Sequence, residues 1–149
     1  SLHTNDAIQA VTRLVDIGVE PFLVGPSLLG IIAQRLVRKL CEKCKQEYTL
    51  SAEEMDELFE WEGLFPLKVY KPKGCQDCNQ TGYNGRIAVH EMILVNEKMR
   101  KMVVNNASLE ELEQEALSAG YQSMKYDGIK KVIRGLTSFE EIERVLPGQ

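Results

Sequence analysis

Apolar residues near the start of the chain recur at the spacing of an amphipathic helix. These positions are Ala7, Ile8, Val11, Leu14 and Val15. They lie three or four residues apart for the most part, so they would share one face of a helix. Asn5 or Asp6 can cap the first amide groups, and Gly18 stands where such a helix should end. The pattern therefore predicts a helix between these two signals.

Two prolines divide the apolar stretch that follows. Pro21 begins a second apolar segment, and Pro26 suits the first turn of a third element at about residues 27–33. Residues 34–40 place apolar side chains among basic ones, which favours a strand.

The middle of the chain changes character. Ser51 and Glu54 have the spacing of a capping box, which predicts a helix that runs to about Glu60. Residues 86–95 are rich in β-forming side chains and predict a strand. We also expect a short β-hairpin within residues 41–90.

The last third of the chain predicts four helices, at about residues 97–105, 109–119, 123–134 and 138–145. Ser108 with Glu111, and Ser138 with Glu141, have capping-box spacing. Because the connections are short, the helices are expected to pack as a small bundle. The chain is thus predicted to be α+β and mostly helical, with domains at 1–40, 41–90 and 91–149.

Composition limits the class of protein. The 149 residues are 44% hydrophobic and 27% charged, which is ordinary for a soluble protein. The net charge of −4 argues against a general nucleic-acid binder. The longest apolar run, residues 22–33, is too short to span a bilayer. Because the chain begins with Ser1 and not with Met, we expect a fragment of a longer protein.

Four cysteines carry the strongest chemical signal. Cys41 and Cys44 form one Cys-x2-Cys pair, and Cys75 and Cys78 form a second pair 30 residues later. Each pair can present two sulfurs to one ion from a tight turn, and two such pairs complete a tetrahedron. We therefore predict one zinc ion. Four thiolates leave no open coordination position, so the site would be structural, and such binding contributes on the order of 10–16 kcal/mol in zinc-finger peptides.

Other interpretations of the cysteines stay open at this point. They are two disulfides, a rubredoxin-like iron site and a redox-active Cys-x-x-Cys. Disulfides are disfavoured because the chain carries no secretory signal. Basic residues cluster in sequence around the two pairs: Arg35, Arg38, Lys39, Lys43, Lys45, Lys71, Lys73 and Arg86. They either offset the charge of a zinc–thiolate centre or form a surface for anionic lipid or an acidic partner.

Sequence motifs for nucleotide chemistry are not found. The chain contains no Gly-x4-Gly-Lys-Ser/Thr loop and no evident pair of acidic residues placed for magnesium. His3 is close to the first residue, and His90 falls in the predicted strand of residues 86–95, where a structural role is expected.

Three stretches resemble the C-terminal end of the type II secretion and type IV pilus assembly ATPases. Residues 2–7, Leu-His-Thr-Asn-Asp-Ala, resemble that family's histidine box. Residues 33–44 resemble the end of its RecA-like core running into the first cysteine pair, and residues 74–86 resemble the second pair and its exit. The tail, with Thr137-Ser138-Phe139-Glu140-Glu141-Ile142, is also similar. The four cysteines favour the secretion and pilus-extension branch.

This resemblance implies a fold and a function. Residues 1–40 would be the C-terminal segment of a RecA-like ATPase domain, followed by a tetracysteine zinc module and a helical domain. The full-length protein would be a homo-hexameric ATP hydrolase that needs ATP and magnesium. It would work at the cytoplasmic face of the inner membrane with a platform protein and a cytoplasmic recruiting protein. His3 would sense the γ-phosphate in the full-length protein only, and this chain alone should be inactive because it lacks the Walker A and B elements.

Two rival hypotheses differ in class. The first is a zinc-ribbon module that binds nucleic acid or protein, which the basic residues favour and the net charge opposes. The second is a thiol-redox protein. The resemblance implies no nucleic-acid partner, and it leaves peripheral membrane association open and does not decide between secretion and pilus assembly.

Overall fold

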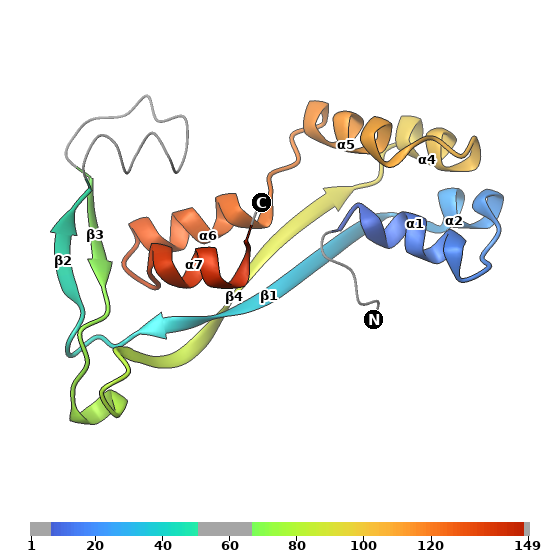
Figure 1. The fold of residues 1–149 in the computed structure, drawn as a ribbon. Coiled ribbons are helices and arrows are strands. Elements are labelled where there is room, and N and C mark those ends of the chain that lie inside the picture. The colour runs from blue at the N-terminus through green and yellow to red at the C-terminus, as the bar shows by residue number, and fades with distance from the viewer. Residues whose placement is uncertain (1–6, 51–66, 148–149) are drawn as a thin grey trace. The chain divides into compact units, whose positions relative to one another are not determined.

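Helices and short two-stranded sheets make up an α+β protein (Figure 1). The computed structural model describes residues 7–50 and 67–147. Within these residues the order of elements is α1 (Gln9–Asp16), α2 (Pro21–Ser27), β1 (Gly30–Leu40), β2 (Gln46–Thr49), β3 (Lys68–Lys71), a 3-10 turn (Gln76–Cys78), β4 (Tyr83–Leu94), α4 (Glu97–Val104), α5 (Leu109–Ser118), α6 (Met124–Ile133) and α7 (Phe139–Val145). None of the helices in these two ranges is long and apolar enough to cross a membrane.

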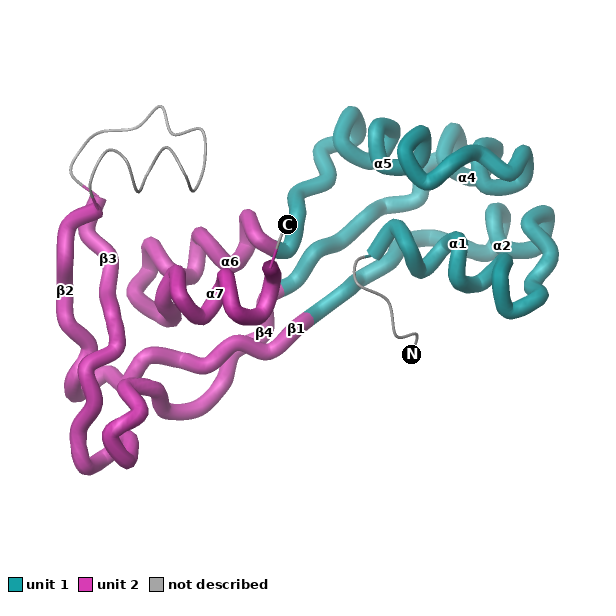
Figure 2. Tube along the Cα trace, in the orientation of Figure 1, with its two compact units in different colours: residues 1–34, 90–124 teal, residues 35–89, 125–149 magenta. Residues whose placement is uncertain are grey.

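The chain divides into two compact units, which Figure 2 shows in different colours. Unit 1 comprises residues 1–34 and 90–124, and unit 2 comprises residues 35–89 and 125–149. Strands β1 and β4 are hydrogen-bonded neighbours, and each contributes residues to both units. The strands run in opposite directions in Figure 1.

Unit 1 packs α1, α2, α4 and α5 around one apolar cluster. The buried members are Ala7, Ile8, Val11, Val24, Ile93, Val95, Met99, Val103, Leu112 and Ala116. Gly25 permits a close approach between α2 and α4, because a Cβ there would lie 2.7 Å from the carbonyl oxygen of Arg100. Asn96 and Ser108 cap α4 and α5 by accepting hydrogen bonds from backbone amides in their first turns.

Unit 2 combines the cysteine segment with α6 and α7. Strands β2 and β3 pair antiparallel, with Gln46 opposite Lys71 and Thr49 opposite Lys68. The fully buried side chains of this unit include Val37, Leu40, Val69, Val89, Val132, Ile142 and Leu146. Gly128 lies against Ile142, since a Cβ there would be 2.8 Å from its Cδ1, so α6 and α7 pack closely.

Several predictions made from the sequence are confirmed. The first helix, the strand that ends at Leu40 and the strand of residues 86–95 are present. The four helices of the last third lie within one residue of their expected bounds at every end. A short antiparallel strand pair also lies between the two cysteine pairs. The helix expected behind Ser51 lies outside the described residues.

One expected element is wrong, and the expected bundle differs from what is found. Residues 27–33 were expected to form a further element behind Pro26, but Pro26 lies inside α2 and β1 already begins at Gly30. The pairing of β1 with β4 extends the strand beyond what local pattern indicated. The last four helices do not form a single bundle, because α4 and α5 belong to unit 1 while α7 and nearly all of α6 belong to unit 2. The domain boundaries and the RecA-like origin of residues 1–40 stay predictions.

Candidate metal centre and the surrounding polar network

The four cysteines that the sequence singled out converge in unit 2. Their Sγ atoms all lie within 4.8 Å of one another. Cys41 and Cys78 are buried, while Cys44 and Cys75 are half-buried. All four are free thiols, and the Sγ pairs of Cys41–Cys75, Cys44–Cys78 and Cys75–Cys78 are 3.9, 3.8 and 3.7 Å apart. No disulfide is therefore formed among these four described cysteines.

The first pair lies in a tight turn that directly follows β1. The amides of Cys44 and Lys45 both donate to the carbonyl oxygen of Cys41, at 3.2 and 2.9 Å. The Cys41 amide in turn donates to the carbonyl oxygen of Gly82 at 2.9 Å. This last bond ties the first cysteine pair to the segment that follows the second pair.

The second pair is shaped by backbone that few residue types adopt. Asn79 and Gln80, which follow the 3-10 turn, have φ values of 52° and 63°. Gly74 has φ 106°, and a Cβ there would lie only 2.8 Å from the carbonyl oxygen of Gln80. The turn closes so that the amides of Cys75 and Gly82 both donate to the Sγ of Cys78 at 3.2 Å.

These contacts change the acidity of two thiols in opposite directions. Burial opposes ionisation of Cys78, but the amides of Cys75 and Gly82 favour the thiolate and lower its pKa to about 6. Burial is the main cause that raises the pKa of Cys44 to about 11. A thiolate is the form that binds a metal, and the Cys78 thiol ionises more readily than the Cys44 thiol.

The geometry of the sulfurs fits a tetrahedral ion. A tetrahedron with Zn–S bonds of about 2.3 Å has edges of roughly 3.8 Å between its sulfurs. Three of the six Sγ–Sγ separations, at 3.7 to 3.9 Å, match that edge, and all six are within 4.8 Å. The four cysteines can therefore hold a metal ion, and the all-sulfur donor set is compatible with zinc.

Charged residues around the two turns are largely paired. Lys43 of the first turn meets Asp77 of the second at 2.6 Å, and Lys45 meets Glu42 at 2.7 Å. Lys45 also lies over the ring of Tyr70, 4.8 Å from its centre. Lys43 and Lys45 are therefore paired within the fold, and both interpretations of the basic cluster stay predictions.

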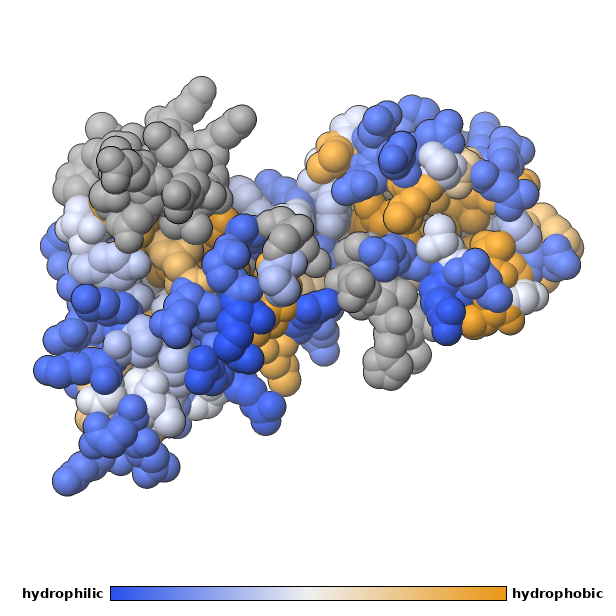
Figure 3. Space-filling view, viewed as in Figure 1, coloured by the Kyte–Doolittle hydropathy of each residue, from blue (hydrophilic) through white to orange (hydrophobic). Residues whose placement is uncertain are grey.

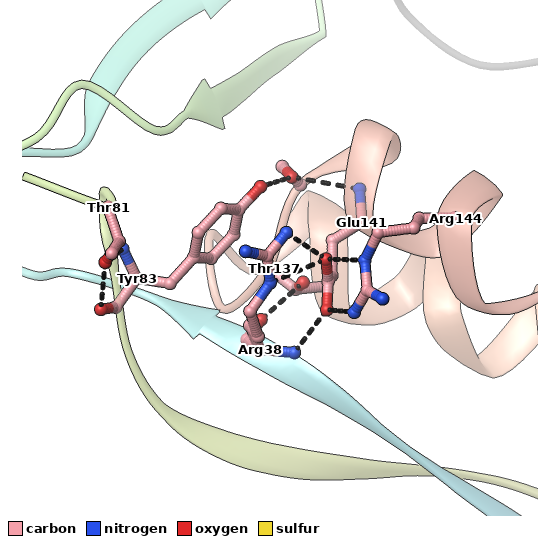
Figure 4. A network of polar contacts seen from close by, with 7 residues as sticks. Arg38, Thr81, Tyr83, Thr137, Glu141 and Arg144 are labelled. Carbon is pink, nitrogen blue, oxygen red and sulfur yellow. Dashed lines mark hydrogen bonds and ion pairs between the residues drawn. The ribbon is translucent and has the colours of Figure 1, made fainter.

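A buried carboxylate, Glu141, anchors α7 to β1 beside the metal centre (Figure 4). It accepts hydrogen bonds from the amide and the guanidinium of Arg38, at 2.6 to 2.9 Å, and from the guanidinium of Arg144. Burial opposes ionisation, but the hydrogen bonds from Arg144 and Arg38 outweigh it and lower the pKa of Glu141 to about 2. The sequence identified Glu141 only as a capping residue. Ser138 does cap α7, but the Glu141 side chain points to the two arginines.

Glu91 plays a similar part in unit 1, and nothing in the sequence pattern singled it out. Its carboxylate is buried in β4 and accepts from the amide of Ala7, the hydroxyl of Tyr121 and the amide of Met124. Only the isolated acid within the apolar sequence Val89-His-Glu-Met-Ile93 could have signalled it. His90 beside it is exposed, and His3 lies outside the described residues.

The fold and the site together define an α+β protein with a four-cysteine centre that can hold a metal ion. The chain belongs to the type II/IV secretion system protein family, whose sequence model matches residues 1–144.

Curated relatives agree with that family. The chain is 44% identical over 145 residues to the type II secretion system ATPase E of Vibrio cholerae, covering 97% of this chain and 28% of the relative. It is 42% identical to the type IV pilus assembly ATPase TfpB of Acinetobacter baylyi, over 99% of this chain and 25% of that protein. It is 41% identical to the type IV pilus assembly ATPase PilB of Thermus thermophilus, over 95% of this chain and 16% of that protein. The chain thus spans little more than a quarter of the length of these relatives, or less.

Proposed function

We propose that this chain is the C-terminal part of a hexameric ATPase that powers assembly of a type II secretion pseudopilus or a type IV pilus. The family match across residues 1–144 and the similarity to secretion and pilus assembly ATPases support the class of machine. The ATP and magnesium sites of that machine would lie outside these residues, which carry no P-loop sequence.

The convergence of the four cysteine sulfurs is the observation that carries the proposal for this chain. Cys41, Cys44, Cys75 and Cys78 would bind one zinc ion as thiolates. Zinc would supply a closed, structural cross-link without an open coordination position. The small strand pair β2–β3 has few buried residues of its own. The cross-link would therefore hold together the start of β2 and the end of β3, which lie next to the two cysteine pairs.

Within the machine, the zinc module and the C-terminal helices would transmit motion to the inner-membrane platform. Transmission over a distance needs elements that move as rigid bodies, and a metal-fixed strand pair meets that requirement. The full-length protein would act at the cytoplasmic face of the membrane with a platform protein and a cytoplasmic recruiting protein. His3 would contribute to sensing the γ-phosphate there.

Metal analysis of the purified chain tests the proposal. We expect about one zinc per chain and no titratable free thiol until a chelator is added. The matched control is the double variant Cys75→Ser/Cys78→Ser, which keeps the first pair and should retain little zinc. A wild-type chain that holds no zinc at saturating metal would contradict the proposed centre, and nucleotide hydrolysis by this chain alone would contradict the proposed division of labour.

A further inference from the structure

The turn between α6 and α7 is contacted by several residues that flank the cysteine pairs. Leu40, which immediately precedes Cys41, donates its amide to the carbonyl oxygen of Leu136 at 2.9 Å. Lys45, which immediately follows Cys44, donates from Nζ to the carbonyl oxygen of Gly135 at 3.0 Å. These two contacts come from the two sides of the first cysteine pair.

The second cysteine pair contributes through Tyr83. The Tyr83 hydroxyl and the Ser138 Oγ lie 2.7 Å apart in a buried hydrogen bond. The neighbouring Gly82 is bound at both its amide and its carbonyl, by the Cys78 Sγ and the Cys41 amide. The guanidinium of Arg38 stacks 4.1 Å above the Tyr83 ring and extends to Glu141 (Figure 4).

Two further contacts close the arrangement. The Thr137 hydroxyl donates to the carbonyl oxygen of Arg38 at 2.8 Å, and Thr137 is fully buried. The ring of Tyr70 in β3 lies so close to Gly135 that a Cβ on Gly135 would come within 2.8 Å of it. We call residues 135–138 together with Glu141 the α6–α7 latch.

From this convergence we infer that metal binding at the four cysteines and closure of the α6–α7 latch are thermodynamically coupled. The metal would fix the backbone from Cys41 to Cys44 and from Cys75 to Cys78, and the latch contacts arise from residues adjoining those two turns. Without the metal, the residues that contact the latch are no longer held in fixed positions relative to one another. The packing of α6 and α7 on these residues then loosens. Coupling is reciprocal: metal binding favours closure of the latch by the same factor by which closure favours metal binding, so a variant that opens the latch should bind the metal less tightly.

The inference rests on the proposed zinc centre and adds what the metal regulates: the order of the C-terminal helix pair. The metal would therefore stabilise more than its own turns. A machine that loses zinc would lose the packing of α6 and α7 on unit 2 as well as the strand pair.

The first arm of the test is amide hydrogen exchange of the chain with zinc and after complete chelation. We expect exchange in residues 124–146 to accelerate at least tenfold on chelation. Residues 97–118 of unit 1 serve as the internal control and should change less than twofold. Protection of residues 124–146 that survives chelation in a chain shown to bind zinc overturns the coupling while leaving the zinc centre intact.

The second arm measures zinc affinity by competition with a chromophoric chelator. Glu141→Gln keeps the shape of the side chain but removes the charge that pairs with Arg38 and Arg144, and it should weaken zinc binding at least fivefold. Glu115→Gln is the matched control, because Glu115 is also a buried acid paired with a cation, Lys98, but lies in unit 1. It should leave zinc affinity unchanged.

A milder variant keeps the test decisive if Glu141→Gln fails to fold. Thr137→Val is nearly isosteric and removes only the bond to the Arg38 carbonyl, and it should weaken zinc binding two- to fivefold. Wild-type affinity in Thr137→Val and in folded Glu141→Gln overturns the coupling. A wild-type chain that never binds zinc refutes the proposed centre and the coupling together, which separates that failure from a failure of the coupling alone.

Discussion

At the scale of single residues, Glu141 is a charged side chain that is fully buried and that stabilises the fold through its hydrogen bonds. Its side chain has no exposure, and the groups that contact it in these hydrogen bonds are all donors. A lowered pKa means that the carboxyl ionises more readily in the folded state than in the unfolded chain, so the ionised form stabilises folding. This contribution is complete above the unfolded-state pKa of 4.5 and is lost as the pH falls from there to about 2.

The pH dependence of stability should therefore depend on Glu141. At pH 7 we expect Glu141→Gln to lower the free energy of unfolding by roughly 3 kcal/mol, the value of a pKa shift of this size. At pH 3 the difference between wild type and variant should shrink to less than half. Denaturant unfolding followed by circular dichroism measures both values. Acid also releases a thiolate-bound metal, and Glu141→Gln is expected to weaken metal binding, so both proteins are compared at each pH with and without a chelator. A difference that stays equal at pH 7 and pH 3 in both conditions would refute the assignment.

Gly135 gives a second prediction at this scale. Its φ of 69° disfavours other residue types, and a Cβ at this position would lie only 2.8 Å from the Tyr70 ring. Gly85, also in unit 2, has φ 79°, but a Cβ at that position would meet no atom within 4 Å. Gly85→Ala should thus cost only the backbone strain, about 1–2 kcal/mol.

Gly135→Ala should cost that strain plus the displacement of an aromatic ring, together about 2–5 kcal/mol. Thermal or denaturant unfolding of both variants in zinc-containing buffer measures the difference. Equal losses of stability in the two variants would show that Tyr70 does not restrict position 135.

At the scale of elements, the sequence predicted the helices whose ends are determined by residues close together in the chain. The helices of the last third were foreseen because capping residues such as Ser108 and terminating glycines act within a few positions. The start of β1 was missed because its pairing with β4 joins residues from distant parts of the sequence, and no local pattern reports that.

The candidate site follows the same division. Cysteine spacing alone identified all four sulfurs that the structure brings together. Arg38 of β1 and Glu141 of the α6–α7 latch form an ion pair but are 103 residues apart, so they could not be paired from one sequence. Glu91, joined to Ala7 across 84 residues, was missed for the same reason.

Glu91 joins three segments of unit 1 and supplies a prediction at this scale. In Glu91→Gln, the amide oxygen should stay toward Tyr121 and Met124, which offer two donors, so the new NH2 group faces the amide of Ala7 and that amide loses its acceptor. We expect a loss of about 1–3 kcal/mol in stability and faster amide exchange at the first turn of α1.

Tyr121→Phe is the control for Glu91. It removes one donor and leaves both backbone amides bound, so exchange at the first turn of α1 should remain close to wild type. Hydrogen exchange resolved to residues 7–12 measures this. If the two variants exchange alike there, the carboxylate of Glu91 does not hold the start of α1.

At the scale of the whole molecule, unit 1 exposes several large apolar side chains. The strand face that turns away from the apolar cluster carries Ile32 of β1 with Met92 and Leu94 of β4, and Ile32 and Leu94 are 67% and 68% exposed. Leu29, just before β1, is exposed as well. Phe22 of α2 is also exposed, and Figure 3 shows hydrophobic residues gathered over the helical part of unit 1. Because the relatives are about four times longer than this chain, we expect further parts of the full-length protein to cover these residues.

The chain in isolation should therefore associate with itself through this strand face. Covering Ile32, Met92 and Leu94 by a second copy removes apolar area from water, which is favourable at about 25 cal/mol per Å². Ile32→Lys/Leu94→Lys should lower both the mass measured by light scattering at high concentration and the fluorescence of a dye that binds apolar surface. Gln114→Lys adds a charge at an exposed polar position of α5, a helix that packs on the apolar cluster and not on this strand face, and should change neither. A wild-type chain that remains monomeric and binds no dye would show that this face needs no partner.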